Sequence, residues 1–191
     1  NLVRHALFAG DVGAPKADAL ATRLAGLLGE PVGAIRCNAL TPGIEHKERF
    51  SQAITEAEVI IDASASVAVS RALSELNDAK ARRVCAFFNP SGTSVVVLAE
   101  NSDRSLTLSD LEAQYHRLAL TDGGLTDHLT PAAPGVRYTG SCRALTNRIP
   151  ASNAAILSGL AAKGVTSALA SDAATITVWT LSPEGEVRRA Q

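Results

Sequence analysis

The chain is most unusual in what it lacks. It contains no methionine, not even an initiator residue, which we expect of a piece of a longer polypeptide. It also contains no G-x-G-x-x-G segment, the glycine loop that lets backbone N–H groups approach a dinucleotide pyrophosphate. Because that fingerprint is absent, an NAD- or FAD-binding domain is the weakest interpretation of the function.

The chain also lacks a large net charge and a long apolar run. The 18 basic and 19 acidic residues give a net charge of -1, so no field gathers nucleic acid or anionic lipid. No apolar run approaches the roughly 18 residues that cross a bilayer, and the N-terminus lacks the order of a signal peptide. We therefore expect a cytoplasmic protein that binds neither nucleic acid nor membrane.

Metal-ligating residues are few and badly spaced for a metal. Cys37, Cys85 and Cys142 are odd in number and never form a C-x-x-C pair, which argues against a disulfide framework and against a structural zinc. The four histidines show no ligand spacing. We expect Cys37 and Cys85 to be small buried residues of strands.

Stretches whose apolar residues recur at helical spacing alternate along the chain with short apolar stretches of strand length. Such alternation predicts an α/β domain with a largely parallel sheet, and a final hairpin turning at 182–185 adds antiparallel strands toward the C-terminal end. Ser109 is a plausible N-cap. The predicted helices are 14–28, 48–56, 69–76, 108–120 and 152–169; the predicted strands are 32–37, 59–64, 84–88, 94–100 and the two arms of 174–190; residues 122–150 are irregular.

Three stretches carry a resemblance to a known family. The first is N-L-x-R at Asn1 to Arg4, followed twelve residues later by Lys16 of G-x-x-K-A. The second is IIDASASVAVSRAL at 60–73, similar to a strand-end segment V-L-D-C-T-D-N with a later arginine. The third, which is less specific, is the overall amino-acid sequence of residues 86–120 and 137–150. On these residues the chain resembles the ThiF/MoeB/HesA family of ubiquitin-activating-like enzymes.

The resemblance implies a Rossmann-like, three-layer fold and an activity. Family members use ATP to adenylate the C-terminal carboxylate of a ubiquitin-like or sulfur-carrier protein. Asn1, Arg4 and Lys16 would line the ATP phosphates, where an Arg fork and a Lys point charge neutralise the charge of departing pyrophosphate. The alternative is that Arg4 and Lys16 are solvated residues near helix ends.

The strand-end segment departs from the family pattern at one position. Asp62 matches the first Asp of the motif, but Ala65 stands where the family has its magnesium-associated carboxylate. Alanine cannot coordinate a cation or hold its waters. Two interpretations of Asp62 remain equal here: a nucleotide or metal ligand, or a side chain that caps a turn.

Cys142 is the best placed thiol for a second chemical step. It lies in the irregular segment beside Arg137, Arg143 and Arg148, and positive neighbours favour the thiolate. In thioester-forming family members such a cysteine takes the activated carboxylate. An unreactive loop cysteine is the equally weighted alternative.

The resemblance covers residues 1–191 as one ThiF-type domain that lacks its first βαβ portion and glycine loop. Adenylation with Mg-ATP is therefore the hypothesis for the parent protein. The alternative is a degenerate module that binds a ubiquitin-like or conjugating-like partner without chemistry. The resemblance also implies a homodimer.

Overall fold

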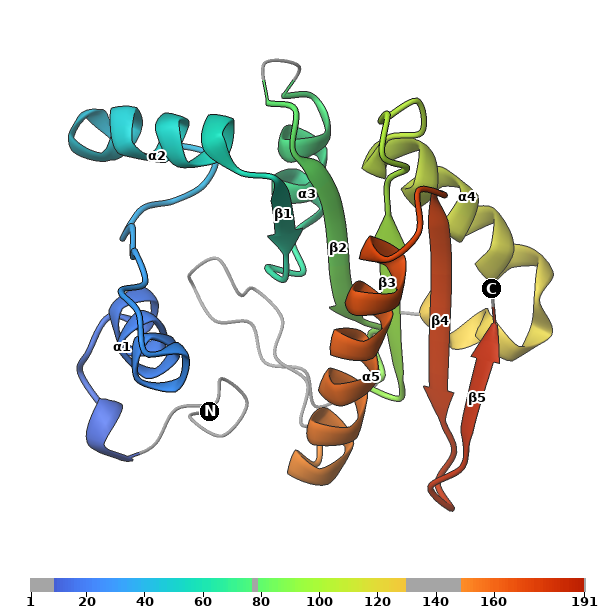
Figure 1. Ribbon diagram of the computed structural model, residues 1–191. Coiled ribbons are helices and arrows are strands. Elements are labelled where there is room, and N and C mark those ends of the chain that lie inside the picture. Colours follow the sequence, from blue (N-terminus) through green and yellow to red (C-terminus); the bar gives the residue numbers. More distant parts are fainter. Residues whose placement is uncertain (1–8, 77–78, 130–148, 191) are drawn as a thin grey trace. The chain divides into compact units, whose positions relative to one another are not determined.

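The computed structural model describes residues 9–76, 79–129 and 149–190, which form two compact units. The first unit is Asn1–Ala57 and the second is Glu58–Gln191 (Figure 1). The single domain predicted for residues 1–191 stays a prediction.

The described part of the first unit contains two α-helices and a short 3-10 helix. These are η2 (Ala9–Asp11), α1 (Lys16–Leu28) and α2 (Ile44–Glu56). Helix α1 ends as predicted at Gly29, whose left-handed φ of 76° lets its N–H donate to the Ala25 carbonyl. The predicted helix at 48–56 is confirmed and begins four residues earlier.

The strand predicted at 32–37 is wrong. These residues form no regular element, and the described residues of the first unit contain no strand. A strand is stable only where the backbone of a neighbour pairs with it. The apolar pattern of V-G-A-I-R-C therefore marks an irregular segment, with Cys37 half-buried rather than buried.

The second unit is built on one five-stranded sheet. Its strands are β1 (Val59–Asp62), β2 (Arg82–Phe88), β3 (Ser94–Ala99), β4 (Thr175–Leu181) and β5 (Val187–Ala190), in that spatial order. Only β1 and β2 are parallel; the other three neighbouring pairs are antiparallel. The prediction of a largely parallel sheet is therefore corrected, whereas the mixed α/β class is confirmed.

The direction of β3 follows from the length of the turn before it. Residues 89–93 connect β2 to β3, and a parallel pair needs a crossover of about a dozen residues or more. A five-residue connection allows only a hairpin. The C-terminal hairpin β4–β5 is confirmed, with Gly185 donating its N–H to the Ser182 carbonyl in the turn.

Helices cover both faces of this sheet. The helices are α3 (Val67–Ser74), α4 (Leu108–Thr121), the 3-10 helix η3 (Gly123–His128) and α5 (Ala151–Leu169). Val96 and Leu98 of β3 pack with α4 on one face, while Val95 and Val97 pack with α5 on the other (Figure 1). Strand β3 is buried along its whole length because both of its faces are covered.

Helix α4 begins at Leu108 as predicted, but its N-cap lies two residues before the predicted one. Thr107, not Ser109, is the N-cap: its hydroxyl accepts the Asp110 N–H, and the Asp110 carboxylate accepts the Thr107 N–H. This is a reciprocal capping box. Ser109 lies inside the helix and donates its N–H to the Ser74 hydroxyl.

A fully buried carboxylate joins the elements at one end of the sheet. Glu100 Oε2 accepts from Arg104 Nε at 2.8 Å and from the Arg83 N–H at 3.3 Å, and Oε1 accepts from the Leu108 N–H at 3.0 Å. Leu108 is the first residue of α4, so Glu100 also satisfies an N–H that the helix cannot. A carboxylate here is favoured by the helix dipole as well.

Two arginines complete this buried network by binding backbone carbonyls. The Arg83 guanidinium, fully buried, donates to the carbonyls of Leu73, Ala81 and Leu76 at 2.9, 2.8 and 2.5 Å. Arg104 donates to the Ala79 carbonyl at 3.1 Å. The end of α3, the approach to β2 and the start of α4 are thus held by one set of charged side chains.

Replacing Glu100 tests this network. We expect Glu100→Ala to lower the free energy of unfolding of the second unit by about 3 kcal/mol or more, because it leaves two arginines without their buried counter-charge. Denaturant unfolding followed by the fluorescence of Trp179, the one tryptophan, measures the change. The exposed Glu184→Ala is the control and should change it by no more than about 0.5 kcal/mol. Equal effects of both changes would contradict the role of Glu100.

A pair of glycines in α5 offers a second test of packing. A Cβ on Gly164 would lie 2.5 Å from Cη2 of Trp179 and 3.2 Å from Val97, whereas one on Gly159 would meet nothing within 4 Å. Gly164→Ala should therefore destabilise by about 1–3 kcal/mol, since the helix must move off the sheet. Gly159→Ala should stabilise by up to about 1 kcal/mol through helix propensity alone. The prediction fails if thermal unfolding shifts in the same direction for both.

Candidate functional site

The residues predicted from the sequence fall into three groups. Asn1, Arg4 and Cys142 lie outside the described residues. Lys16 belongs to the first unit and Asp62 to the second.

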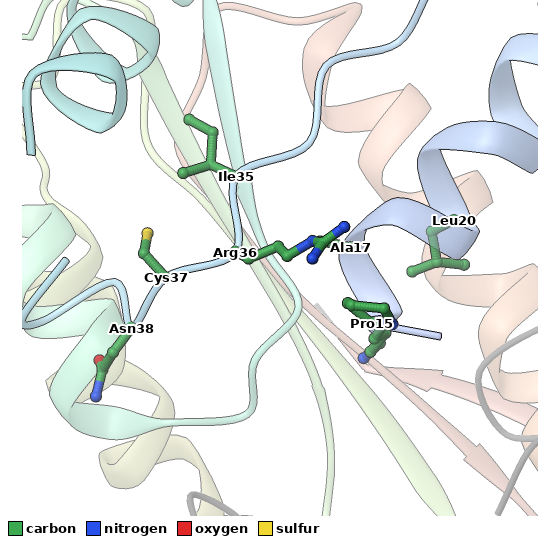
Figure 2. Close-up of a pocket in the computed structure, with 8 residues that line it drawn as sticks. Pro15, Ala17, Leu20, Ile35, Arg36, Cys37 and Asn38 are labelled. Atoms are coloured by element: carbon green, nitrogen blue, oxygen red, sulfur yellow. The ribbon is translucent and has the colours of Figure 1, made fainter. Parts of the chain in front are cut away.

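Lys16 lies on the wall of an open hollow within the first unit. The hollow has a volume of about 520 Å³ and is lined by the start of α1, including Pro15, Lys16 and Leu20, and by residues 35–38 of the irregular segment (Figure 2). Lys16 is the first residue of α1, and its N-cap, Pro15, makes no side-chain capping bond. The sequence thus places a lysine at the positive end of a helix dipole.

Arg36 is the second cation of this hollow, and the sequence did not single it out. Its Nη2 forms an ion pair with Asp18 Oδ2 in the first turn of α1. Figure 2 shows the Arg36 side chain extended toward the start of α1, whereas Cys37 and Asn38 point away from it. A basic residue within a segment predicted as a buried strand was the signal that could have drawn attention to it.

Asp62 ends β1 with its carboxylate turned into the second unit. Its side chain is almost fully buried; Oδ1 accepts the Ser64 N–H at 2.8 Å, and Oδ2 lies 3.8 Å from the Cys85 Sγ. These are the bonds of the turn-capping alternative. A nucleotide or metal role for Asp62 stays a prediction.

Cys85 confirms the expectation of a buried strand cysteine. It lies in β2 opposite Asp62 in the parallel register. Burial, and next the negative charge of Asp62, raise the pKa of the Cys85 thiol to about 12. A thiol with that pKa is almost entirely protonated at neutral pH, so Cys85 is a poor nucleophile.

The turn after Asp62 is held by serines and contains Ala65. Ser64 Oγ accepts the Ser66 N–H at 3.2 Å, and Ser66 caps α3 by accepting the Val69 N–H at 3.4 Å. Ala65 itself has a left-handed φ of 54°. Within residues 9–76, 79–129 and 149–190, no three residues among His, Cys, Asp and Glu lie close enough together to hold a metal ion.

A polar cluster that the sequence did not predict lies where β2 ends and β3 begins. Asp127 Oδ2 accepts from Asn89 Nδ2 at 2.8 Å, from Ser91 Oγ at 2.7 Å and from Thr93 Oγ1 at 3.2 Å. Asn89, which is buried, also accepts the Thr93 and Ser94 N–H groups through Oδ1. One carboxylate from η3 therefore fixes the whole turn between the two strands.

His128 lies next to this cluster, buried under α4. Its Nδ1 forms a 2.8 Å hydrogen bond with the Tyr115 hydroxyl, and its Nε2 is 3.9 Å from Asp127 Oδ1. Among the described residues, Nε2 has no hydrogen-bond partner. Burial lowers the pKa of His128, and Asp127 opposes this only in part.

The lowered pKa of His128 predicts a pH dependence of stability. The unfolded chain takes up this proton at a pKa of about 6.5 and the folded chain only at a lower pH, so unfolding binds protons and stability falls below about pH 6.5. The Trp179-monitored free energy of unfolding should therefore drop between pH 7.5 and 5.5. His128→Gln should reduce that drop, whereas the exposed His116→Gln on α4 should leave it in place. An unchanged slope in His128→Gln would contradict the prediction.

No model of a protein family matches the chain, and no curated protein matches it. None of the described helices is long and apolar enough to cross a membrane.

Proposed function

We propose that this chain belongs to an enzyme that binds ATP and adenylates the C-terminal carboxylate of a ubiquitin-like or sulfur-carrier protein. The observation that carries the proposal is the position of Lys16. It begins α1 and lines a hollow that it shares with Arg36. The sequence resemblance independently implies that Lys16 lines the ATP phosphates.

Three features of the hollow favour the binding of a phosphate chain. Its wall combines a lysine, an arginine and the N-terminal end of a 13-residue helix without a side-chain cap. Each of these favours negative charge. Pro15, Leu20 and Ile35 supply apolar wall beside the cations.

In the proposed reaction, negative charge develops on the departing pyrophosphate, which the cations of the hollow would stabilise. A carboxylate oxygen attacks the α-phosphorus of ATP; a C–O–P bond forms, and the bond to the bridging oxygen breaks. That oxygen leaves with the bond's electron pair as part of pyrophosphate. Cations preorganised beside the phosphates stabilise this developing charge without reorganising at the moment of reaction.

The segment that matches the family's magnesium-associated motif does not fit a magnesium ion. Both Asp62 oxygens face groups of the protein itself, Ser64 N–H and the Cys85 thiol, and Ala65 has no ligand atom. No step is therefore derived through a metal held by this segment.

The same observation favours a second candidate. A catalytically degenerate module would keep the fold and bind a ubiquitin-like or conjugating-like partner without chemistry. Homodimerisation, cytoplasmic location and transfer of the carboxylate to Cys142 also stay predictions. Each rests on the sequence alone.

The adenylation proposal is tested by exchange of labelled pyrophosphate into ATP. The whole enzyme to which the chain is proposed to belong, with its glycine loop, is incubated with Mg-ATP and a sulfur-carrier protein that ends in Gly-Gly, and Mg-ATP binding is measured by calorimetry. Lys16→Ala should reduce exchange at least about tenfold, because a charge-assisted contact to phosphate is lost. Lys47→Ala removes an exposed lysine from α2 of the same unit and is the matched control.

The outcomes separate the two candidates. Exchange that requires the carrier and is lost in Lys16→Ala, but kept in Lys47→Ala, supports adenylation. Binding of the carrier without exchange or Mg-ATP binding overturns it in favour of the partner-binding module.

A further inference from the structure

His128 is buried with one ring nitrogen left without a partner. The residue is 5% exposed, and its Nδ1 is held by the Tyr115 hydroxyl of α4 at 2.8 Å. Among the described residues, Nε2 forms no hydrogen bond. Oδ1 of Asp127 lies 3.9 Å from Nε2, about 1 Å beyond the length of a charge-assisted hydrogen bond. A buried polar atom of this kind calls for an explanation.

The other oxygen of Asp127 holds the turn between β2 and β3. Oδ2 accepts from Asn89 Nδ2, Ser91 Oγ and Thr93 Oγ1 at 2.8, 2.7 and 3.2 Å. Asn89 is thereby oriented so that its Oδ1 accepts the N–H groups of Thr93 and Ser94. One carboxylate therefore faces a buried imidazole with one oxygen and holds a turn with the other.

The protonation state of His128 decides what Nε2 requires. In the imidazolium both ring nitrogens carry hydrogen, so Nδ1 donates to the Tyr115 hydroxyl and Nε2 requires an acceptor. Among the described residues, Asp127 is the one acid within ion-pair distance of His128. A charged donor that is buried without an acceptor is more costly than a neutral one. The imidazolium therefore favours a shorter distance between Nε2 and Oδ1 than the neutral ring does.

The other titratable groups around His128 do not compete for this proton. Burial raises the pKa of Tyr115 to about 12, and burial and the charge of Asp62 raise the pKa of Cys85 of β2 to about 12, so both are neutral near pH 6. Burial lowers the pKa of His128 itself, and Asp127 is the charged group that opposes this. The other ionisable groups on the elements beside it are His116, whose ring contacts Tyr115, and the ion pair of Asp122 with Arg188 of β5.

We propose that Asp127 and His128 form a proton-operated switch: uptake of a proton by the buried imidazole draws the carboxylate to Nε2 and releases the turn at residues 89–93. A movement of about 1 Å brings Oδ1 into hydrogen-bond range of Nε2. The same movement takes the bonds of Oδ2, now 2.7–3.2 Å long, out of that range. The switch is independent of the adenylation proposal.

The turn that the switch releases also supports the approach to α5. Ile149 lies two residues before α5 and packs on Gly92, where a Cβ would lie 2.4 Å from Cγ1 of Ile149. Only a glycine turn held in its present place allows this close approach. Release of the turn therefore loosens the start of α5 together with the ends of β2 and β3.

The side-chain NH2 group of Asn89 reports the bond to Asp127 directly. NMR spectra of the isotope-labelled 191-residue chain follow this group and the ring C–H of His128 from pH 7.5 down to the pH at which the chain unfolds. The variants are His128→Gln, which takes up no proton, and Asp127→Asn, which removes the charge. His116→Gln on α4 is the matched control, because His116 is exposed. The indole signal of Trp179 shows at each pH whether the chain is folded.

We expect the Asn89 signal to shift with the same midpoint as His128, below about pH 6.5, while the chain is still folded. In Asp127→Asn the His128 midpoint should fall by about 0.5 pH units or more, because the charge that favours the imidazolium is gone. In His128→Gln the Asn89 shift at that midpoint should disappear. His116→Gln should leave both titrations in place.

Three results would overturn the switch. The first is a His128 titration during which the Asn89 signal stays unchanged, and the second is an Asn89 shift that persists in His128→Gln. The third is a His128 that stays neutral until the Trp179 signal of the folded chain disappears, since its proton would then accompany global unfolding.

Discussion

The second unit depends on the burial of one carboxylate, that of Glu100. Glu100 directly follows β3, and its carboxylate accepts an N–H of β2 and the first N–H of α4 and pairs with Arg104. Burying an ion is costly, and removing one partner leaves an uncompensated charge. The side chains of Arg83 and Arg104 also donate to backbone carbonyls at the end of α3 and in the segment before β2. The arrangement is stable only when complete, so it fixes where α3, β2 and α4 meet.

The sequence predicted the elements of this fold better than their directions. Periodicity identified α4, α5, β2 and β3 within a few residues, because it reports which face of each element is buried. It carries no information on which strands pair. The antiparallel β2–β3 hairpin was missed, and the apolar run at 32–37 was mistaken for a strand. A run of that length cannot show whether a neighbour exists to pair with it.

The candidate sites show the same limit at the level of side chains. Lys16 was found through its motif, but Arg36 lies twenty positions later with no motif around it, and only folding brings both to one hollow. The Asp127 carboxylate binds side chains 34 to 38 positions away in the chain. Local patterns predict caps and turns, such as the end of α1 at Gly29, because those bonds span few residues. Contacts of long sequence separation leave no such local trace.

The distribution of hydrogen bonds explains why we place ligand binding in the first unit. In the second unit, the polar groups at the carboxyl ends of β1 and β2 are already engaged within the protein: Asp62 by Ser64 and Cys85, and Asp127 by the turn before β3. A ligand there would have to replace bonds that hold the fold together. Arg36 instead keeps one ion pair at an exposed hollow, where a phosphate adds bonds without breaking any in the core. We therefore propose ligand binding at the start of α1, where it would break no bond of the Glu100 network or of the Asp127 cluster.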